Sequence, residues 1–147
     1  MIKDSDSRQA IMHYNRPIHQ YDKNGDFVCT LYSQFFIRNN KLYMTTCMRS
    51  MDLLYGYPFD VVFFTLMQQS MRLELLKYYP TLELGSYTHF VGSLHMYERN
   101  FDTFIEMNKN EYIPETLPVL TESLVKHPDL NKSESDNEFI QWIIKNK

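Results

Sequence analysis

Two neighbouring stretches of the chain are rich in β-branched and aromatic residues and contain few breakers. They cover residues 27–37 and 41–48, and the dipeptide Asn39-Asn40 lies between them. Asparagine tolerates the positive φ angles of a tight hairpin turn, so the pattern predicts a β-hairpin with a type I′ turn. Apolar residues fall on both faces of both strands. We therefore expect the hairpin to be buried on both sides or to lie in a subunit interface.

The longest apolar stretch follows Pro58 and predicts a buried helix over residues 59–79, ended by Pro80. Residues 84–97 predict another strand, in which Gly85 and Gly92 mark bulges or points of close approach. Weaker patterns predict helices over 5–14, over 98–107 and after the capping box Ser135-x-x-Glu138. They also predict a turn at 22–26, a short edge strand at 117–120 and a flexible loop at 127–137. The element order α-β-β-α-β-α indicates an α+β fold, with a mixed sheet packed on the long helix, in a single domain over 1–147.

The overall composition excludes several classes of protein. An apolar content of 44% and an aromatic content of 15% indicate a folded chain, and a net charge of −3 without a block of like charge makes nucleic acid an unexpected partner. The start of the chain lacks the apolar core of a secretory signal, and the apolar run 58–67 is too short to span a bilayer. We therefore expect a cytoplasmic protein without a membrane partner. Its two cysteines, Cys29 and Cys47, form no disulfide framework, and no Cys/His spacing predicts a metal site.

The stretch 49–60, between the second strand and the long helix, has more polar residues than a connection needs. Arg49, Ser50, Asp52 and Asp60 flank a Gly/Pro junction. A guanidinium fork beside a hydroxyl can bind phosphate, although an ordinary surface ion pair explains the arginine equally well. The stretch predicts an anion-binding turn.

Three further side chains are candidates for chemistry. Cys29, in a strand, is the sole candidate nucleophile, and the alternative is a buried cysteine that acts as a small hydrophobic residue. His95 and Tyr97 are two positions apart in a predicted strand, so they project from one face and either grip a sugar or serve structure alone. His89 and His13 have no acidic or thiol partner at a useful spacing in the sequence and receive no role.

Together and in this order, these residues resemble the thymidylate synthase family, which includes the deoxycytidylate hydroxymethylases. The spacing from Cys29 to Asp60 needs no gap, and the resemblance covers roughly residues 4–107. The motifs that carry it are Ser7-Arg8, Cys29, Gln34-Phe35-Phe36, Arg49-Ser50-x-Asp52, Gly56-x-Pro58-Phe59-Asp60 and Gly92-x-x-His95-x-Tyr97.

The resemblance implies a role for each motif. Cys29 is expected to be the catalytic thiolate that adds to C6 of a pyrimidine nucleotide, with 5,10-methylenetetrahydrofolate as the one-carbon donor. Arg49 and Ser50 are expected to hold the 5′-phosphate, and the arginine also supplies positive charge near the thiolate. His95 and Tyr97 resemble the pair that hydrogen-bonds the deoxyribose hydroxyl.

Two further residues of the resemblance concern the folate and the partner subunit. Asp52 resembles the aspartate that faces the folate pterin. Arg8 resembles one of a pair of arginines that reach the partner's phosphate across a two-fold axis, which implies a homodimer.

Asp60 is the most informative departure from synthases that act on dUMP, which have asparagine here. An amide can donate to uracil O4, whereas a carboxylate only accepts unless it is protonated. A carboxyl suits cytosine, whose N4 amino group donates and whose N3 can share a proton. The resemblance therefore implies a preference for dCMP, and the alternative is drift in a site that no longer binds a base.

Other departures bear on activity. One arginine of the usual pair is Gln9, and the family's usual residues are replaced by Thr30, Met48 and Ser93. The family's N-terminal part, with the glutamate that organises protons at the base, has no counterpart. Three hypotheses follow: part of a dCMP C5-hydroxymethyltransferase completed by a separate N-terminal-half protein, a catalytically inactive nucleotide-binding or dimerisation module, and a dUMP-methylating thymidylate synthase. Whether the chain is an enzyme by itself is left open.

Overall fold

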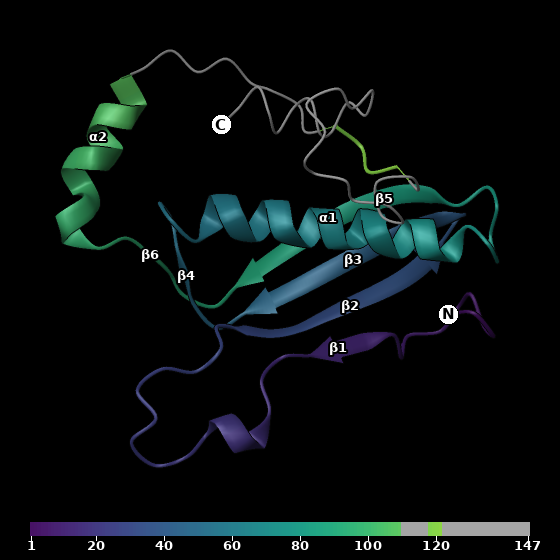
Figure 1. Cartoon of the computed structure of the whole chain (residues 1–147), viewed down its shortest axis with the longest axis horizontal. Coiled ribbons are helices and arrows are strands. Elements are labelled where there is room, and N and C mark those ends of the chain that lie inside the picture. Colours follow the sequence, from purple (N-terminus) through teal and green to yellow (C-terminus); the bar gives the residue numbers. More distant parts are fainter. Residues whose placement is uncertain (110–117, 122–147) are drawn as a thin grey trace, which may run out of the picture.

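The structure, a computed structural model, describes residues 1–109 and 118–121 and is built on one four-stranded sheet (Figure 1). The strand order is β1-β2-β3-β5, with β1 and β3 antiparallel to β2 and β5 parallel to β3. The sheet is therefore mixed, as predicted. Its strands are β1 (Ile11–His13), β2 (Thr30–Arg38), β3 (Lys41–Met48) and β5 (Glu83–Val91).

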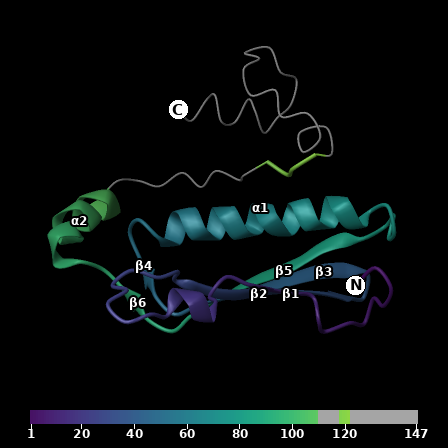
Figure 2. The ribbon, with the colours of Figure 1, turned by 60° about the horizontal axis from the view of Figure 1, so that its bottom comes forward.

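The long helix α1 (Tyr57–Leu75) connects β3 to β5 and lies along one face of the sheet (Figure 2). A two-stranded parallel ribbon, β4 (Met51–Asp52) with β6 (Leu94–His95), forms where the chain leaves the sheet. Two 3₁₀ helices are present in the described residues, η1 (Pro17–His19) and η2 (Glu98–Asn100), and the second leads into α2 (Phe101–Lys109). Helix α2 lies beyond the β4–β6 ribbon, away from the sheet (Figures 1 and 2). The predicted α+β fold is confirmed.

The β2–β3 hairpin forms at the predicted dipeptide. Asn39 and Asn40 have φ angles of 49° and 58°, and Arg38 pairs with Lys41 across the turn. Positive φ at both central residues defines the type I′ turn, whose twist matches that of the flanking strands. The prediction of this hairpin and its turn is confirmed.

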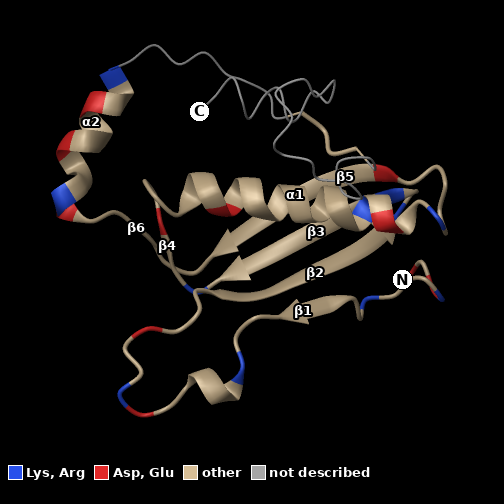
Figure 3. Ribbon diagram, in the orientation of Figure 1, with Lys and Arg blue, Asp and Glu red and all other residues tan. Residues whose placement is uncertain are grey.

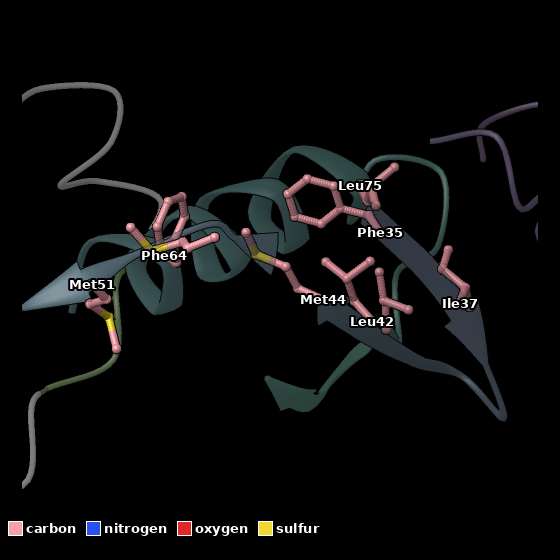
Figure 4. Close-up of a cluster of buried hydrophobic side chains, with 9 residues drawn as sticks. Phe35, Ile37, Leu42, Met44, Met51, Phe64 and Leu75 are labelled. Carbon is pink, nitrogen blue, oxygen red and sulfur yellow. The ribbon is translucent and has the colours of Figure 1, made fainter. Parts of the chain in front are cut away.

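Burial alternates along both hairpin strands, so only one face of the hairpin is buried. Ser33, Phe35 and Ile37 of β2 are buried, and the residues between them stay partly exposed. Of the two predicted alternatives, burial on both sides is not found in the described part of the chain, because α1 covers one face alone. A position in a subunit interface stays a prediction. The core cluster under α1 consists of Phe35, Ile37, Leu42, Met44, Met48, Met51, Phe64, Leu75 and Leu82 (Figure 4).

A buried glutamine fixes α1 to the sheet where the β3–β5 register shifts. The amide nitrogen of Gln68 donates to the carbonyls of Leu42 (2.8 Å) and Gly85 (3.1 Å), and the shift lies between Leu42 and Met44. A Cβ at Gly85 would lie 2.9 Å from the Tyr43 ring, so glycine is needed at this close approach. The bulge expected at Gly85 is confirmed, and the amide satisfies carbonyls there.

Three local predictions differ from the structure. Residues 5–14 form no helix, because residues 11–13 pair with β2 as an edge strand and the Ala10 carbonyl accepts from the Phe35 amide at 2.9 Å. The strand expected over 84–97 is interrupted at Gly92, where a Cβ would meet the Arg49 carbonyl at 3.1 Å, and its last part pairs with β4 instead. Residues 118–120 are not a strand.

The remaining predicted elements are close to the observed ones or cannot be compared. The long helix begins two residues earlier than expected and ends at Leu75, and the helix expected over 98–107 is found as η2 and α2. The loop at 127–137 and the helix after Ser135 lie outside the described residues. No helix in the described part of the chain has the length and apolar character needed to cross a membrane.

Candidate functional site

The β4–β6 ribbon brings the stretch 49–60 beside the stretch 92–97. Met51 pairs with Leu94 and Asp52 with His95, and the amides of Met51 and Leu53 donate to the carbonyls of Ser93 (3.0 Å) and His95 (2.8 Å). These backbone bonds set the candidate polar residues of the two stretches at one end of the sheet.

Ser50 and His95 meet directly at this junction. The Ser50 hydroxyl lies 3.4 Å from Nδ1 of His95, and the rings of His95 and Tyr97 stand edge to face with their centroids 5.2 Å apart. The residue predicted to hold a phosphate and the two predicted to hold a sugar are thus neighbours. Their roles stay predictions.

Arg49 lies beside Cys29, where β2 and β3 begin to separate. The Arg49 amide donates to the Cys29 carbonyl at 2.9 Å. Its guanidinium donates to the carbonyls of Phe27 (2.8 Å) and Val28 (3.4 Å) and lies 4.3 Å above the Phe27 ring. The guanidinium therefore fixes the segment that leads into the cysteine, which is a structural task that the sequence did not reveal. Cys29 is a half-buried free thiol that packs against the core cluster.

Asp52 builds the turn between β4 and α1. Its Oδ1 accepts from the amides of Leu54 (2.7 Å) and Tyr55 (2.8 Å). These bonds, the one from Tyr55 foremost, hold the pKa of the Asp52 carboxyl below its ordinary value. A Cβ at Gly56 would lie 2.8 Å from the Asp52 carbonyl oxygen, so the turn requires glycine.

Asp60 lies in the first turn of α1, and its amide donates to the Gly56 carbonyl at 2.8 Å. The side chain is half-buried, and burial raises the pKa of its carboxyl above the ordinary value. The charge of His89 on β5 lowers the pKa of Asp60 and so opposes the effect of burial. Burial lowers the pKa of His89 itself, and Asp60 counteracts this effect.

His89 was missed by the sequence interpretation, since its acidic neighbour is 29 positions away in sequence and on another element. The alternation of side chains along β5 could have indicated it. Tyr87, His89 and Val91 lie on one face of β5, and the β3 residues paired with them are buried under α1. The phenol of Tyr87 lies 2.8 Å from Nδ1 of His89.

Arg8 lies apart from this group, along the β1 edge of the sheet. Its backbone carbonyl accepts from the Gln34 amide nitrogen at 2.9 Å, and the residue is exposed. The described contacts of this chain do not bring its side chain to Arg49 or Ser50. A role across a subunit interface stays a prediction.

Comparison with known proteins identifies the family. Residues 1–138 match the family model described as thymidylate synthase, so the chain belongs to the thymidylate synthase family. It is 37% identical over 102 residues to a deoxycytidylate 5-hydroxymethyltransferase of Enterobacteria phage T6, covering 65% of this chain and 42% of that protein. It is 32% identical over 85 residues to a thymidylate synthase of Bacillus licheniformis, covering 57% of this chain and 29% of that protein.

The fold agrees with this assignment. A thermostable thymidylate synthase A from Bacillus subtilis superposes with a TM-score of 0.63 at 25% identity, covering 76% of this chain and 38% of that one. The chain thus spans less than half the length of the relatives it matches.

Proposed function

We propose that the chain forms the nucleotide-binding part of a pyrimidine deoxynucleotide C5-hydroxymethyltransferase that prefers dCMP. Membership of the family and similarity to phage deoxycytidylate 5-hydroxymethyltransferases support this proposal. The observation that carries it is Asp60, a half-buried carboxyl at the start of α1 whose pKa burial raises.

The hydrogen-bonding capacity of the Asp60 carboxyl would favour cytosine over uracil. A carboxyl and cytosine N3 can share one proton, while the N4 amino group donates to the other carboxyl oxygen. Uracil N3 carries its own proton, and its O4 would oppose an ionised carboxylate, which leaves two acceptors facing each other. Such a mismatch in a buried site costs about 1–3 kcal/mol, or about tenfold to a hundredfold in affinity.

The other residues of the site would hold the rest of the nucleotide. Ser50 would bind the 5′-phosphate and His95 with Tyr97 the deoxyribose, in agreement with the contact between Ser50 and His95. Arg49 would reach the phosphate with those guanidinium N–H groups that do not donate to the carbonyls of Phe27 and Val28. Cys29 would supply the thiolate that attacks C6 of the base.

The carboxylate of Asp52 is suited to accept hydrogen bonds from a folate. The lowered pKa of the Asp52 carboxyl keeps it ionised, and only its Oδ1 is engaged by the turn in the contacts described above. An ionised, half-exposed carboxylate can accept from the N–H groups of a pterin ring. When bound, 5,10-methylenetetrahydrofolate would supply the one-carbon unit.

We also propose that two copies of the chain pair through the sheet face opposite α1. This face carries partly exposed aromatic residues, among them the stacked pair Phe36 and Tyr43 and the 63% exposed Phe90. Strands β2, β3 and β5 each contain a single charged residue, and all three lie at the hairpin end of the sheet (Figure 3). An uncharged aromatic face of this kind is suited to burial against a copy of itself. Arg8 lies along the β1 edge of this sheet.

A separate protein is proposed to supply the remaining part of the enzyme. The first turns of α1 expose Phe59 (72%) and Phe63 (57%), which are suited to packing against further protein. Without such a protein, the chain would be a binding module, and the packing of Cys29 against the core favours this second candidate.

Calorimetry with dCMP and dUMP tests the base assignment. Wild type is expected to bind dCMP more tightly by about tenfold or more, and Asp60→Asn to reverse the order. An unchanged preference in Asp60→Asn would contradict the proposed base contact. Cys29→Ala should bind dCMP as wild type does, since the thiol acts in chemistry rather than in binding.

Tritium release from C5 of dCMP tests catalysis. Release by the chain with the folate donor, alone or with the complementary protein, is expected for the enzyme and should be lost in Cys29→Ala. Binding without release under either condition would favour the binding module.

A further inference from the structure

A line of hydroxyl groups crosses the sheet beneath α1. The Tyr14 hydroxyl lies 3.3 Å from Oγ of Ser33, which lies 2.9 Å from Oγ1 of Thr46. Thr46 hydrogen-bonds the phenol of Tyr87, and that phenol lies 2.8 Å from Nδ1 of His89. Ser33 and Thr46 are fully buried, so these polar groups depend on one another for hydrogen bonds. We call Tyr14, Ser33, Thr46 and Tyr87 the hydroxyl column.

The two ring nitrogens of His89 fix the direction of the hydrogen bond at the end of the hydroxyl column. Nε2 of His89 lies 3.0 Å from the sulfur of Met48, which can only accept, so Nε2 carries the ring proton. Nδ1 is then an acceptor, and the Tyr87 phenol donates a hydrogen bond to it. Thr46 donates to that phenol, in agreement with its effect of lowering the pKa of Tyr87, which burial raises to about 12.

This arrangement favours the uncharged form of His89. Protonation of Nδ1 would require the Tyr87 phenol to turn away and would leave a hydroxyl without its acceptor in a half-buried place. The His89 ring packs edge to face on Phe64 with the centroids 6.0 Å apart, and Asp60 lies one turn before Phe64 on α1. The titratable groups that act on one another here are Asp60 from α1, Tyr87 and His89 from β5, and Tyr14 after β1. A neutral His89 leaves Asp60 without a neighbouring cation among these groups.

We propose that the hydroxyl column, by keeping His89 neutral, lets Asp60 retain the proton that it shares with the pyrimidine base. His89 and Tyr87 are then positioning residues for binding of the base, because they act on the base only through Asp60. An imidazolium at position 89 would instead stabilise the ionised carboxylate. The role of the hydroxyl column in binding the base rests on the proposed function, whereas the coupling between His89 and Asp60 is a property of the protein without nucleotide.

Nuclear magnetic resonance of the full chain without nucleotide tests the coupling. Imidazole nitrogen shifts report the tautomer and charge of His89, and side-chain carboxyl shifts report the titration of Asp60. In wild type, His89 is expected to be neutral with its proton on Nε2 at about pH 7. In Tyr87→Phe, the His89 midpoint should rise and the Asp60 midpoint fall by about half a pH unit or more.

Tyr43→Phe is the matched control, because Tyr43 lies on the opposite face of the sheet and stacks on Phe36. It should leave both midpoints unchanged. Thr46→Val removes the donor to Tyr87 and should shift both midpoints in the same direction as Tyr87→Phe, which provides a second variant should that one not fold. An Asp60 midpoint unchanged in the folded variants, or a proton on Nδ1 in wild type at about pH 7, would overturn the inference.

The dependence of dCMP affinity on pH separates this inference from the proposed function. In Tyr87→Phe, the pH at which dCMP binding weakens should fall by the same amount as the Asp60 midpoint. Shifted midpoints in a protein that binds no nucleotide at any pH would support the coupling and contradict the proposed function. Binding of dCMP with unshifted midpoints would support the proposed function and contradict the coupling.

Discussion

Ser50 and His95 are 45 positions apart in the sequence, and the hydroxyl of one lies 3.4 Å from Nδ1 of the other. The backbone pairing of Met51 with Leu94 places them there. Two groups proposed for opposite ends of a sugar phosphate therefore share one hydrogen-bonding junction. We therefore expect a change at one residue to alter the hydrogen bonding of the other, so the proposed site can be tested through either.

Ser50→Ala should weaken dCMP binding by about tenfold or more, since it removes a hydrogen bond to a charged phosphate. Deoxycytidine, which has no phosphate, should lose much less affinity, and calorimetry with both ligands makes the comparison. Ser93→Ala is the control, because the described contact of Ser93 at this junction uses its backbone carbonyl. Equal losses for dCMP and deoxycytidine would place the hydroxyl elsewhere than at the phosphate.

Gly56→Ala should destabilise the fold by about 1–3 kcal/mol, because its Cβ would lie 2.8 Å from the Asp52 carbonyl oxygen. The backbone must shift there, and the turn before α1 shifts with it. Urea unfolding measures the loss. Gly25→Ala is the matched control, as its Cβ would meet no atom within 4 Å, and a loss equal to that of Gly56→Ala would contradict the steric explanation.

Asp60→Asn should stabilise the protein near neutral pH. The folded-state pKa of Asp60 is raised, so its contribution to stability is present below the unfolded value of about 3.9 and is lost as pH rises through the folded-state value. The side chain is partly exposed and screened by solvent, so we expect a gain of only about 0.5 kcal/mol at pH 7.

Thermal unfolding of wild type and Asp60→Asn at about pH 7 and about pH 4 measures this gain, which should vanish at the lower pH. Asp22→Asn, in an exposed loop residue, controls for the general loss of a negative charge. A stabilisation that is the same at both pH values would contradict the assignment to burial of the charged form.

Phe90→Asp should turn a dimer into a monomer, since it puts a charge into the aromatic sheet face. Light scattering after gel filtration measures the mass. Phe59→Asp is the matched control, an exposed phenylalanine on α1 that should leave the dimer intact. A wild-type protein that remains monomeric at high concentration, or a dimer that survives Phe90→Asp, would contradict pairing through this face.

Local chemistry was sufficient to predict several elements. Asn39 and Asn40 define their turn because their side chains tolerate positive φ, and Gly85 and Gly92 mark close approaches because a Cβ does not fit there. The residues of the stretch 49–60 were recognisable as a group, since the turn and the start of α1 are contiguous in the sequence. A non-local partner misled the prediction for residues 5–14, where pairing with β2 overrode a weak helical pattern.

The sequence by itself determined the family, the mixed α+β fold and the residue types of the proposed site, because motif spacing and turn chemistry are properties of short segments. Only the tertiary structure decided what these side chains contact. It assigned the Arg49 guanidinium to the carbonyls before Cys29 and the Asp52 carboxylate to its own turn. It also placed His89, 29 positions away along the chain, where its charge acts on the pKa of Asp60. Burial and charge act through space, and distances between elements are fixed only when the helix packs on the sheet.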